Sequence, residues 1–205
     1  MNQLRVSGGR VLRPDGRVER ADVAVDRDEG TIRAVGGPSD VDDAVGGATD
    51  ETLDASGSLV IPGLVNAHTH VAMTLLRGYA DDKPLDPWLR EDIWPAEAAL
   101  TPDDVEVGAE LGALEMIRSG TTAFADMYFA MDRVAAVVDR AGLRARLGHG
   151  VVTVGKDDAD ARSDVAESLA VARELDGAAD GRIRTAFMPH SLTTVGEEYL
   201  REGVA

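Results

Sequence analysis

Two histidines are separated by a single residue in the segment VIPGLVNAHTH, residues 60–70. Side chains along a β-strand repeat every two residues, so His68 and His70 are expected to project from the same face. Two neutral imidazoles on one face can hold one divalent ion, and imidazole is a common ligand of zinc and similar metals. Because the sequence contains no cysteine, any metal must be held by His, Asp or Glu. The pair therefore predicts a metal site.

The histidine pair lies at the carboxyl end of the first of four strand patterns, and longer helical patterns follow these strands. Alternating strands and helices predict βα units around a parallel sheet. The strands are predicted at residues 64–68, 121–126, 144–152 and 183–188, and the helices at residues 101–118, 132–141 and 160–175, with a further helix beginning after residue 196. Barrels of such units place their active sites at the carboxyl ends of the strands.

The residues before the barrel pattern differ from it in their spacing of apolar and turn residues. Short alternating segments separated by Gly, Pro and Asp turns predict strands and hairpins, so residues 1–58 are expected to form a β-sandwich segment. Residues 36–50 are rich in Gly and Asp and are predicted to form a mobile surface loop. The predicted fold class is α/β: residues 59–205 hold about four βα units of a (β/α)₈ barrel. A whole barrel needs about 250 residues, so we expect a truncated, N-terminal part.

The composition excludes several classes of partner. A formal net charge of −16 repels nucleic acid and anionic membranes. The start of the chain lacks a signal-peptide pattern, and no apolar run is long enough to span a membrane, so a cytoplasmic location is expected. Lys occurs only at Lys83 and Lys156, and acidic residues are spread along the chain. This pattern suits a protein that stays hydrated in concentrated salt, and it predicts a halophilic source.

The β-rich leader, the Pro62-Gly63 turn and the strand that ends in His68-Thr69-His70 together resemble the opening of the amidohydrolase superfamily. Later segments resemble its S-adenosylhomocysteine and 5′-methylthioadenosine deaminase branch, which shares them with chlorohydrolases; they are residues 73–78, 88–89, 94–97 and 126–129. The resemblance implies one divalent metal, with zinc as the first candidate and iron or manganese as alternatives. It also implies hydrolytic deamination of 5′-methylthioadenosine, S-adenosylhomocysteine or 5′-deoxyadenosine. A chlorohydrolase or another cyclic-amidine aminohydrolase is the alternative.

The same resemblance assigns substrate contacts. It places Trp88 against the purine or thioether, although Trp88 could also anchor its own loop. It implies that Glu97 accepts hydrogen bonds from the ribose hydroxyls, with a solvated helix-leading acid as the other interpretation. It implies that His190 hydrogen-bonds the purine, where an ordinary loop histidine is the alternative. Asp126 either orients a metal ligand or caps its strand.

His149 lies where deaminases of this branch may present an Arg to the carboxylate tail of the substrate. A neutral imidazole cannot replace a guanidinium on a carboxylate, so His149 favours a less anionic nucleoside, unless Arg162 reaches that tail.

The remaining machinery implied by the resemblance is a third His on the fifth strand with a Glu after it, a further His on the sixth strand, and an Asp on the eighth. None of these is among the 205 residues, so no catalytic residue is assigned within this chain. The chain alone is expected to be unstable and inactive. A non-catalytic fragment that only binds metal or associates with other subunits is the competing class. A longer form could be a homo-oligomer that acts on a small-molecule nucleoside.

Overall fold

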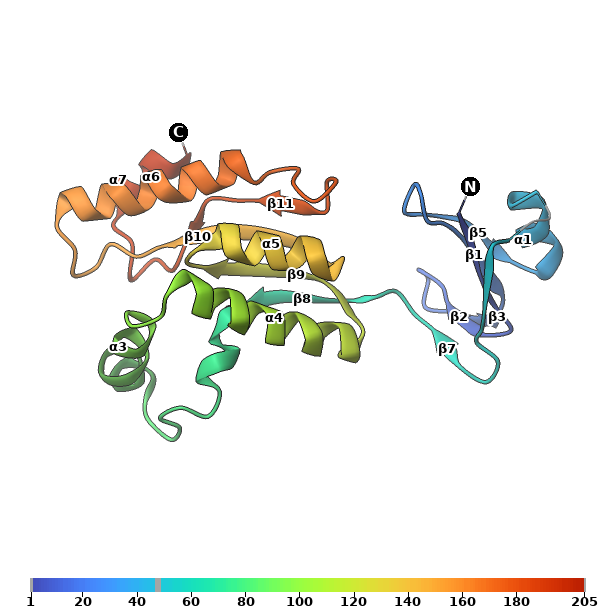
Figure 1. The fold of residues 1–205 in the computed structure, drawn as a ribbon, viewed down its shortest axis with the longest axis horizontal. Helices are drawn as coiled ribbons and strands as arrows, with labels where there is room; N and C mark the ends of the chain where they lie inside the picture. Colours follow the sequence, from blue (N-terminus) through green and yellow to red (C-terminus); the bar gives the residue numbers. More distant parts are fainter. Residues whose placement is uncertain (1, 47–48, 205) are drawn as a thin grey trace. The chain divides into compact units, whose positions relative to one another are not determined.

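The computed structural model describes residues 2–46 and 49–204. The chain divides between Pro62 and Gly63 into two compact units, which Figure 1 shows in the colours of the sequence. We refer to them as the N-terminal unit and the C-terminal unit and describe each by itself. No helix in the described ranges is long and apolar enough to cross a membrane.

The N-terminal unit contains two small sheets. The four-stranded sheet has the order β5-β4-β1-β6, with β5 at Thr31–Gly36, β4 at Asp22–Asp26, β1 at Gln3–Ser7 and β6 at Glu51–Asp54. The three-stranded sheet has the order β3-β2-β7, with β3 at Val18–Arg20, β2 at Arg10–Leu12 and β7 at Leu59–Val60. Val11 of one sheet and Val23 of the other are buried in the same hydrophobic cluster, so the two sheets share a core.

The prediction of a loop over residues 36–50 is wrong for most of that segment. The structure has helix α1 at Pro38–Ala44, and β6 begins at Glu51. Pro38 is compatible with a first helical turn, and Asp40 Oδ2 accepts a hydrogen bond from the Gly37 amide at 2.8 Å. Val41 is fully buried against Ala24, so the helix has an apolar anchor that the Gly- and Asp-rich composition concealed. Residues 47 and 48 of the predicted loop lie outside the described residues.

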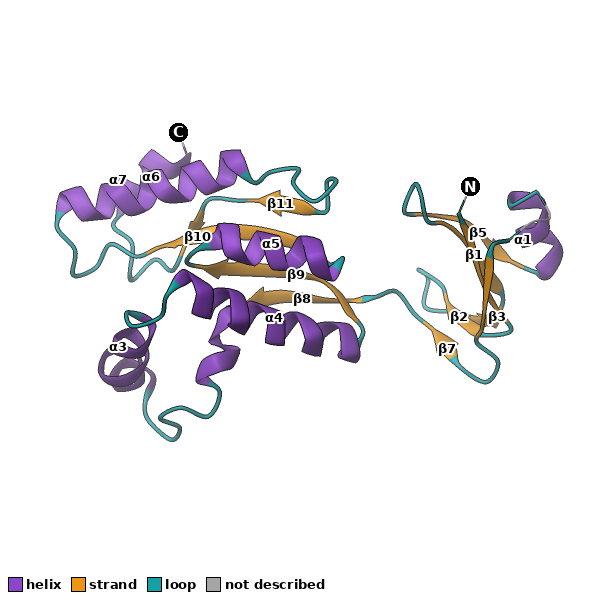
Figure 2. Ribbon diagram, viewed as in Figure 1, coloured by secondary structure: helices purple, strands orange, loops and turns teal. Residues whose placement is uncertain are grey.

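The C-terminal unit is a parallel sheet with helices along one face (Figure 2). Its order is β11-β10-β9-β8, with β8 at Leu64–Thr69, β9 at Thr121–Tyr128, β10 at Arg144–Val151 and β11 at Ile183–Thr185. The short strand β12, Met188–Pro189, continues the line of β11 along β10. The helices are α4 at Pro102–Ser119, α5 at Met131–Ala141, α6 at Asp158–Glu174 and α7 at Glu197–Val204. Four strands therefore alternate with helices, as the sequence predicts.

Helix α4 begins and ends where its sequence signals lie. Thr101 and Asp104 form a capping box: Asp104 Oδ2 accepts from the Thr101 amide at 2.8 Å, and Thr101 Oγ1 accepts from the Asp104 amide at 3.3 Å. Gly120 ends the helix with φ of 83°, a conformation that glycine adopts without strain. The helix packs on the sheet through buried Val105, Ala109 and Met116.

The connection between β8 and α4 is a series of short helical segments. Its first segment, η1 at Val71–Leu76, is a 3₁₀-helix that directly follows His70. The others are α2 at Leu85–Pro87, a π-helix η2 at Trp88–Ile93 and α3 at Trp94–Glu97. A long connection of this kind at the carboxyl ends of barrel strands usually shapes the pocket.

Candidate metal and active site

The two faces of the sheet in the C-terminal unit differ in their residues. Phe124, Asp126 and Tyr128 of β9 are buried on the face that the helices cover, which we call the helix face. The alternate residues of β9, including Ala125 and Met127, belong to the opposite face, which we call the inner face. In a closed barrel this face points to the interior.

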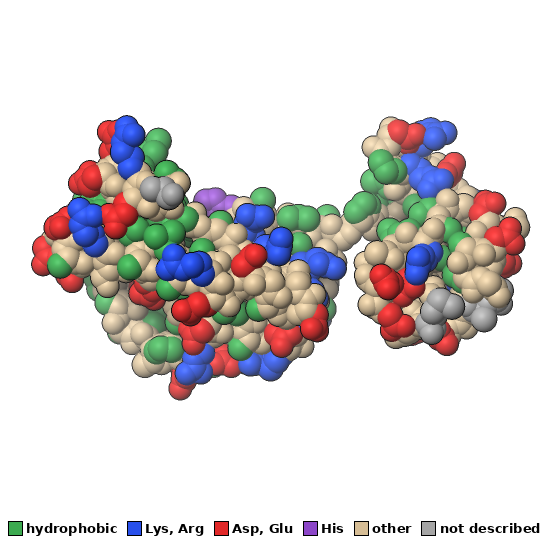
Figure 3. All heavy atoms as spheres, turned by 90° about the horizontal axis from the view of Figure 1, so that it is seen from above, with side chains coloured by type: hydrophobic (Ala, Val, Ile, Leu, Met, Phe, Trp, Pro, Cys, Tyr) green, Lys and Arg blue, Asp and Glu red, His purple; other side chains and the backbone are tan. Residues whose placement is uncertain are grey.

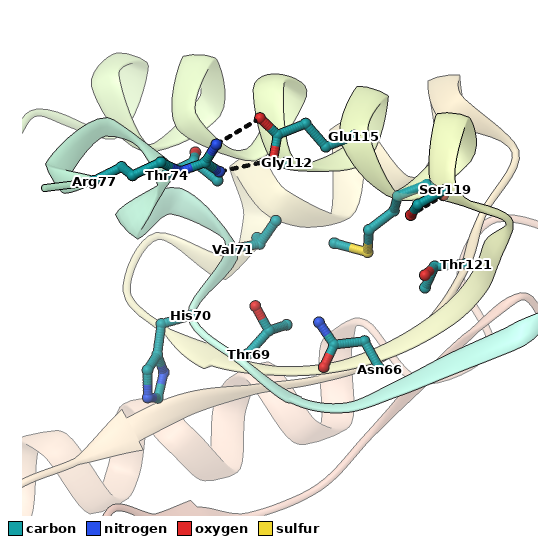
Figure 4. A pocket seen from close by; sticks show the side chains of 11 residues that line it. Asn66, Thr69, His70, Val71, Thr74, Arg77, Gly112, Glu115, Ser119 and Thr121 are labelled. Carbon is teal, nitrogen blue, oxygen red and sulfur yellow. Dashed lines mark hydrogen bonds and ion pairs between the residues drawn. The ribbon is translucent and has the colours of Figure 1, made fainter.

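The register between β8 and β9 decides where the histidines point. Asn66 pairs with Phe124 and Thr69 pairs with Asp126, so β8 has one more residue than β9 over this stretch. Such a bulge re-aims the side chains that follow it. In Figure 4, Asn66 and Thr69 line a pocket of about 390 Å³ beside α4, whereas the His70 ring points away from them. Asn66 and Thr69 thus belong to the helix face, and His70 belongs to the inner face.

His68 and His70 form a pair of neighbouring imidazoles. Their ring centroids are 5.5 Å apart and their planes meet at 80°. His70 Nδ1 lies 2.7 Å from the main-chain carbonyl oxygen of Met127. A carbonyl can only accept, so Nδ1 carries the hydrogen and Nε2 keeps the lone pair that a metal needs. The histidine pair therefore fits a divalent metal.

The pair supplies only part of a ligand set. Across residues 2–46 and 49–204, no three His, Cys, Asp or Glu side chains lie close enough together to hold a metal ion. A catalytic zinc site usually has three protein ligands and one open position. A zinc ion held by the histidine pair would therefore need at least one further ligand from outside the described residues.

Asp126 holds the main chain just after His70. Its Oδ1 accepts a hydrogen bond from the Val71 amide at 2.9 Å. The side chain is fully buried, and Oδ2 has no hydrogen-bond partner within the described parts of the chain. Burial raises the pKa of Asp126 to about 7, while the bond from Val71 opposes the rise. Asp126 fixes the start of η1 and does not receive a histidine N–H.

Glu97 and Tyr128 lie beside the histidine pair. The Tyr128 ring is 6.4 Å from that of His70. Its buried hydroxyl forms no hydrogen bond of ordinary geometry within the described residues, although the Glu97 carboxylate lies near enough to interact with it. Burial raises the pKa of Glu97, while Tyr128 and His70 oppose that rise. Burial and then Glu97 raise the pKa of Tyr128. The predicted substrate residue Glu97 is therefore within electrostatic reach of the predicted ligand His70.

His190 reaches the same region from the segment after β12. Its Nδ1 lies 2.8 Å from Thr194 Oγ1. Partial burial lowers the pKa of His190, and His70 and His68 lower it further. The structure thus brings His68, His70 and His190 near one another at the carboxyl ends of their strands, with Nε2 of His190 free of the bond to Thr194.

Trp88 lies on the connection between β8 and α4, at the start of η2. Its indole Nε1 donates a hydrogen bond to the Tyr79 carbonyl at 3.2 Å. The N–H of this half-buried side chain is therefore used to fasten the connection, and only the ring could contact a substrate.

His149 lies in a different place from the one its predicted substrate role requires. It pairs in register with Tyr128, which places it on the helix face. It is 5 % exposed, its ring centroid is 5.7 Å from that of Phe129, and its Nδ1 is 3.2 Å from Glu167 on α6. Burial lowers the pKa of His149, and Glu167 opposes this. The structure does not bring His149 together with the other histidines, because strand alternation points it toward α6.

Two groups of the site were not predicted. The Met127 carbonyl is a main-chain group that every residue type carries, so the sequence cannot predict its role. Tyr128 belongs to residues 126–129, which resemble the deaminase branch. The apolar pattern of its strand, however, does not reveal that its buried hydroxyl lacks a hydrogen-bond partner of ordinary geometry within the described residues. Only the assembled sheet shows that the Met127 carbonyl oxygen lies 2.7 Å from His70 Nδ1 and the Tyr128 ring 6.4 Å from the His70 ring.

Similarity to known proteins identifies the family. The sequence model described as the amidohydrolase family matches residues 59–205. A 5-methylthioadenosine/S-adenosylhomocysteine deaminase of Haloarcula marismortui is 68 % identical over 100 % of this chain and 46 % of that protein. A 5′-deoxyadenosine deaminase of Methanothermobacter thermautotrophicus is 53 % identical over 78 % of this chain and 37 % of that protein.

A solved structure gives the same result for the fold. The crystal structure of an adenosine deaminase from Xanthomonas campestris with bound zinc superposes with a TM-score of 0.83 at 36 % identity, over 99 % of this chain and 46 % of that one. The predicted fold class is confirmed. This chain spans about half the length of the relatives that it matches.

Proposed function

Because this chain belongs to the amidohydrolase family, we propose that it forms part of a metal-dependent hydrolase that deaminates adenosine-type nucleosides. The candidate substrates are 5′-methylthioadenosine, S-adenosylhomocysteine and 5′-deoxyadenosine, which the names of its relatives carry. The observation that carries the proposal is the histidine pair, in which His70 is oriented by the Met127 carbonyl with Nε2 left free. The similarity to a zinc-bound adenosine deaminase supports zinc as the metal.

Each residue of the site has a chemical task in this proposal. His68 and His70 hold the metal, which when bound lowers the pKa of water and so makes a nucleophile available at neutral pH. The Met127 carbonyl keeps the hydrogen of His70 on Nδ1 and prevents the ring from turning.

The substrate contacts lie on either side of the histidine pair. Glu97 offers two carboxylate oxygens to the vicinal hydroxyls of a ribose. His190 is anchored through Nδ1 on Thr194 and presents Nε2 to the purine. Partial burial and then the neighbouring His70 and His68 lower the pKa of His190, which favours the neutral ring, and Nε2 of that ring accepts a hydrogen bond when Nδ1 carries the hydrogen.

The source and setting of the protein follow from its charge. A net charge of −16 with two lysines matches a protein that works in concentrated salt, and a relative at 68 % identity comes from Haloarcula marismortui. We therefore place the protein in a halophile.

The metal site is tested on the chain itself by titration with Co²⁺, followed through its visible absorption, and with Zn²⁺ by calorimetry. His68→Ala and His70→Ala should each remove tight binding. His190→Gln is the matched control and should leave the affinity unchanged, because His190 is assigned to the substrate. Equal affinity of wild type and His70→Ala would refute the assignment.

The reaction is tested on a chimera that joins this chain to the remaining part of the Haloarcula marismortui relative. The adenine-to-hypoxanthine absorbance change is followed with each of the three nucleosides, and release of chloride from a chlorotriazine is measured in parallel. Deamination is the expected result. Turnover of the triazine alone would replace the proposed substrate class with a chlorinated ring.

A further inference from the structure

Three arginines lie on the inner face at the amino-terminal ends of β10 and β11. Arg144 and Arg146 alternate with the buried residues of β10, so they belong to the inner face. Arg184 of β11 pairs in register with Arg146. All three line one depression of about 350 Å³ in this part of the sheet. We call Arg144, Arg146 and Arg184 the arginine layer.

The arginine layer has almost no acidic partners. Within the described ranges, neither Arg144 nor Arg146 forms an ion pair, and Arg146 Nη1 reaches only the Thr185 carbonyl at 3.5 Å. Arg184 has a loose pair with Asp176 at 3.4 Å, in which both side chains are exposed. By contrast, Arg140 on α5 pairs with two glutamates at 2.8 and 2.7 Å. In a chain with a net charge of −16, unpaired neighbouring arginines are unexpected.

Most residues around the arginine layer are small, although Phe124 and Arg182 also line the depression. Arg144 pairs in register with Ala123, and Arg146 pairs with Ala125. Val65 and Ala67 of β8 line the same depression. Figure 3 shows Lys and Arg side chains (blue) on a face that also carries histidine (purple). The alanines leave space on the inner face for long side chains and for whatever pairs with them.

Like charges at register positions of neighbouring strands destabilise a sheet. The interior of an eight-stranded barrel is a packed core, and Arg146, on the second inner-face position of β10, enters that core when the barrel closes. A buried guanidinium is tolerated only when it is paired and hydrogen-bonded. In the described residues β11 is an edge strand of the sheet, so a further strand can pair there and bring carboxylates to the inner face.

We propose that the arginine layer is a docking site for carboxylate side chains of the polypeptide that completes the barrel, with at least one Asp or Glu on the strand that pairs with β11. Arg184 lies on the last strand of the sheet and Arg146 lies beside it, so one carboxylate can bridge the two guanidinium groups. The resulting ion-pair layer lies at the opposite end of the strands from His68 and His70. The proposal rests on family membership and not on the nature of the substrate.

The first test uses the chain as it is, in thermal unfolding at low ionic strength. Arg146→Glu places a carboxylate between Arg144 and Arg184 and should raise the unfolding midpoint by about 1–3 °C. Arg146→Gln removes the charge without supplying a carboxylate and should give a smaller rise. Both rises should shrink in about 1 M KCl. Equal midpoints for the two variants at low salt would overturn the proposal.

The second test places Arg146→Glu in the chimera with the remaining part of the Haloarcula marismortui relative. There the introduced carboxylate meets the acidic partner in the barrel interior, so the unfolding midpoint should fall, and fall further than with Arg146→Gln. The expected result is that Arg146→Glu raises the unfolding midpoint of the chain and lowers that of the chimera. A midpoint that moves in the same direction in both proteins would show that no carboxylate docks on the layer. Because unfolding is measured without substrate, a failed deaminase assay leaves this result intact.

Discussion

At the scale of the residue, some groups of the candidate site can be predicted from the sequence and others cannot. The spacing of His68 and His70 predicts a shared face, and the structure places their rings 5.5 Å apart. The extra residue in β8 is not visible in that spacing, yet it sets the register against β9. His149 shows the opposite case, because its position at a strand end suggests a site residue while its alternation points it toward α6.

A first prediction concerns Asp126, which anchors the Val71 amide next to His70. Asp126→Ala should weaken Zn²⁺ binding by about tenfold, since partners that orient a ligand typically contribute about 10–100-fold to metal affinity. Asp126→Asn keeps an acceptor oxygen and should retain most of the affinity.

Calorimetric titration of the folded variants measures this effect. Asp132→Ala, which removes an exposed acid from α5, is the control and should bind as the wild type does. Unchanged affinity in Asp126→Ala would show that η1 keeps His70 in place without this bond.

A second prediction concerns the pH dependence that Asp26 gives to the N-terminal unit. Hydrogen bonds from the Glu29 amide and Arg33, with a further one from Gln3, lower the pKa of this buried carboxyl from 3.8 to about 2. A carboxyl with a lowered folded-state pKa stabilises the fold above its unfolded pKa and loses that effect as the pH falls through the folded value.

Asp26→Asn should therefore be less stable than the wild type at pH 7, and the gap should narrow between about pH 4 and pH 2. Urea unfolding at a series of pH values measures the gap. A gap that stays constant down to pH 2 would contradict the role of the charge.

At the scale of the element, local signals located α4 and the strands well. Thr101, Pro102 and Gly120 mark the ends of α4, and the structure has its helix at Pro102–Ser119. The helix α1 was missed because its stability comes from Val41 packing on Ala24, a contact between distant parts of the chain. The short helices between β8 and α4 were predicted only as a long connection, since their apolar residues have no single period.

A third prediction concerns the contact between α4 and η1. A Cβ added at Gly108 would lie 2.4 Å from the Ala72 carbonyl oxygen, so Gly108→Ala must push η1 away from α4. The change should destabilise the C-terminal unit although alanine favours a helix by about 1 kcal/mol over glycine.

Urea unfolding gives the free energy, and Zn²⁺ titration reports whether the displacement reaches His70, the residue before η1. Val107→Ala, on the exposed side of the same helix, should change neither quantity appreciably. A stabilised Gly108→Ala variant would mean that the two elements are not in close contact.

At the scale of the whole molecule, the alternation of strands and helices was enough to predict a run of βα units, and the order β11-β10-β9-β8 agrees with it. The arginine layer was not predicted, because Arg144 and Arg146 resemble ordinary solvated residues until the strands are aligned. Arg184 becomes their neighbour only through the pairing of β10 with β11. Register is a property of the assembled sheet and cannot be predicted from the sequence of a single strand.

A fourth prediction follows from the excess of acidic residues. Raising KCl from about 0.1 M to about 1 M shortens the Debye length from about 10 Å to about 3 Å, which screens the repulsion within a chain of charge −16. The thermal unfolding midpoint should therefore rise with KCl.

A variant with exposed acids neutralised, Asp43→Asn with Glu174→Gln and Glu198→Gln, carries less repulsion and should show a smaller rise. These three side chains are exposed and form no ion pair within the described residues, so their replacement mainly removes negative charge. A midpoint that falls with KCl would show that the ion pairs outweigh the repulsion.

The bond between His70 and the Met127 carbonyl also bears on how such a protein can evolve. Every amino acid carries a main-chain oxygen, so a point mutation at codon 127 cannot delete the acceptor. The side chain of Met127 lies on the inner face beside Gly150, where an added Cβ would be 3.4 Å from Met127 Cγ. Selection can therefore vary that side chain while the orientation of His70, the proposed metal ligand, is kept.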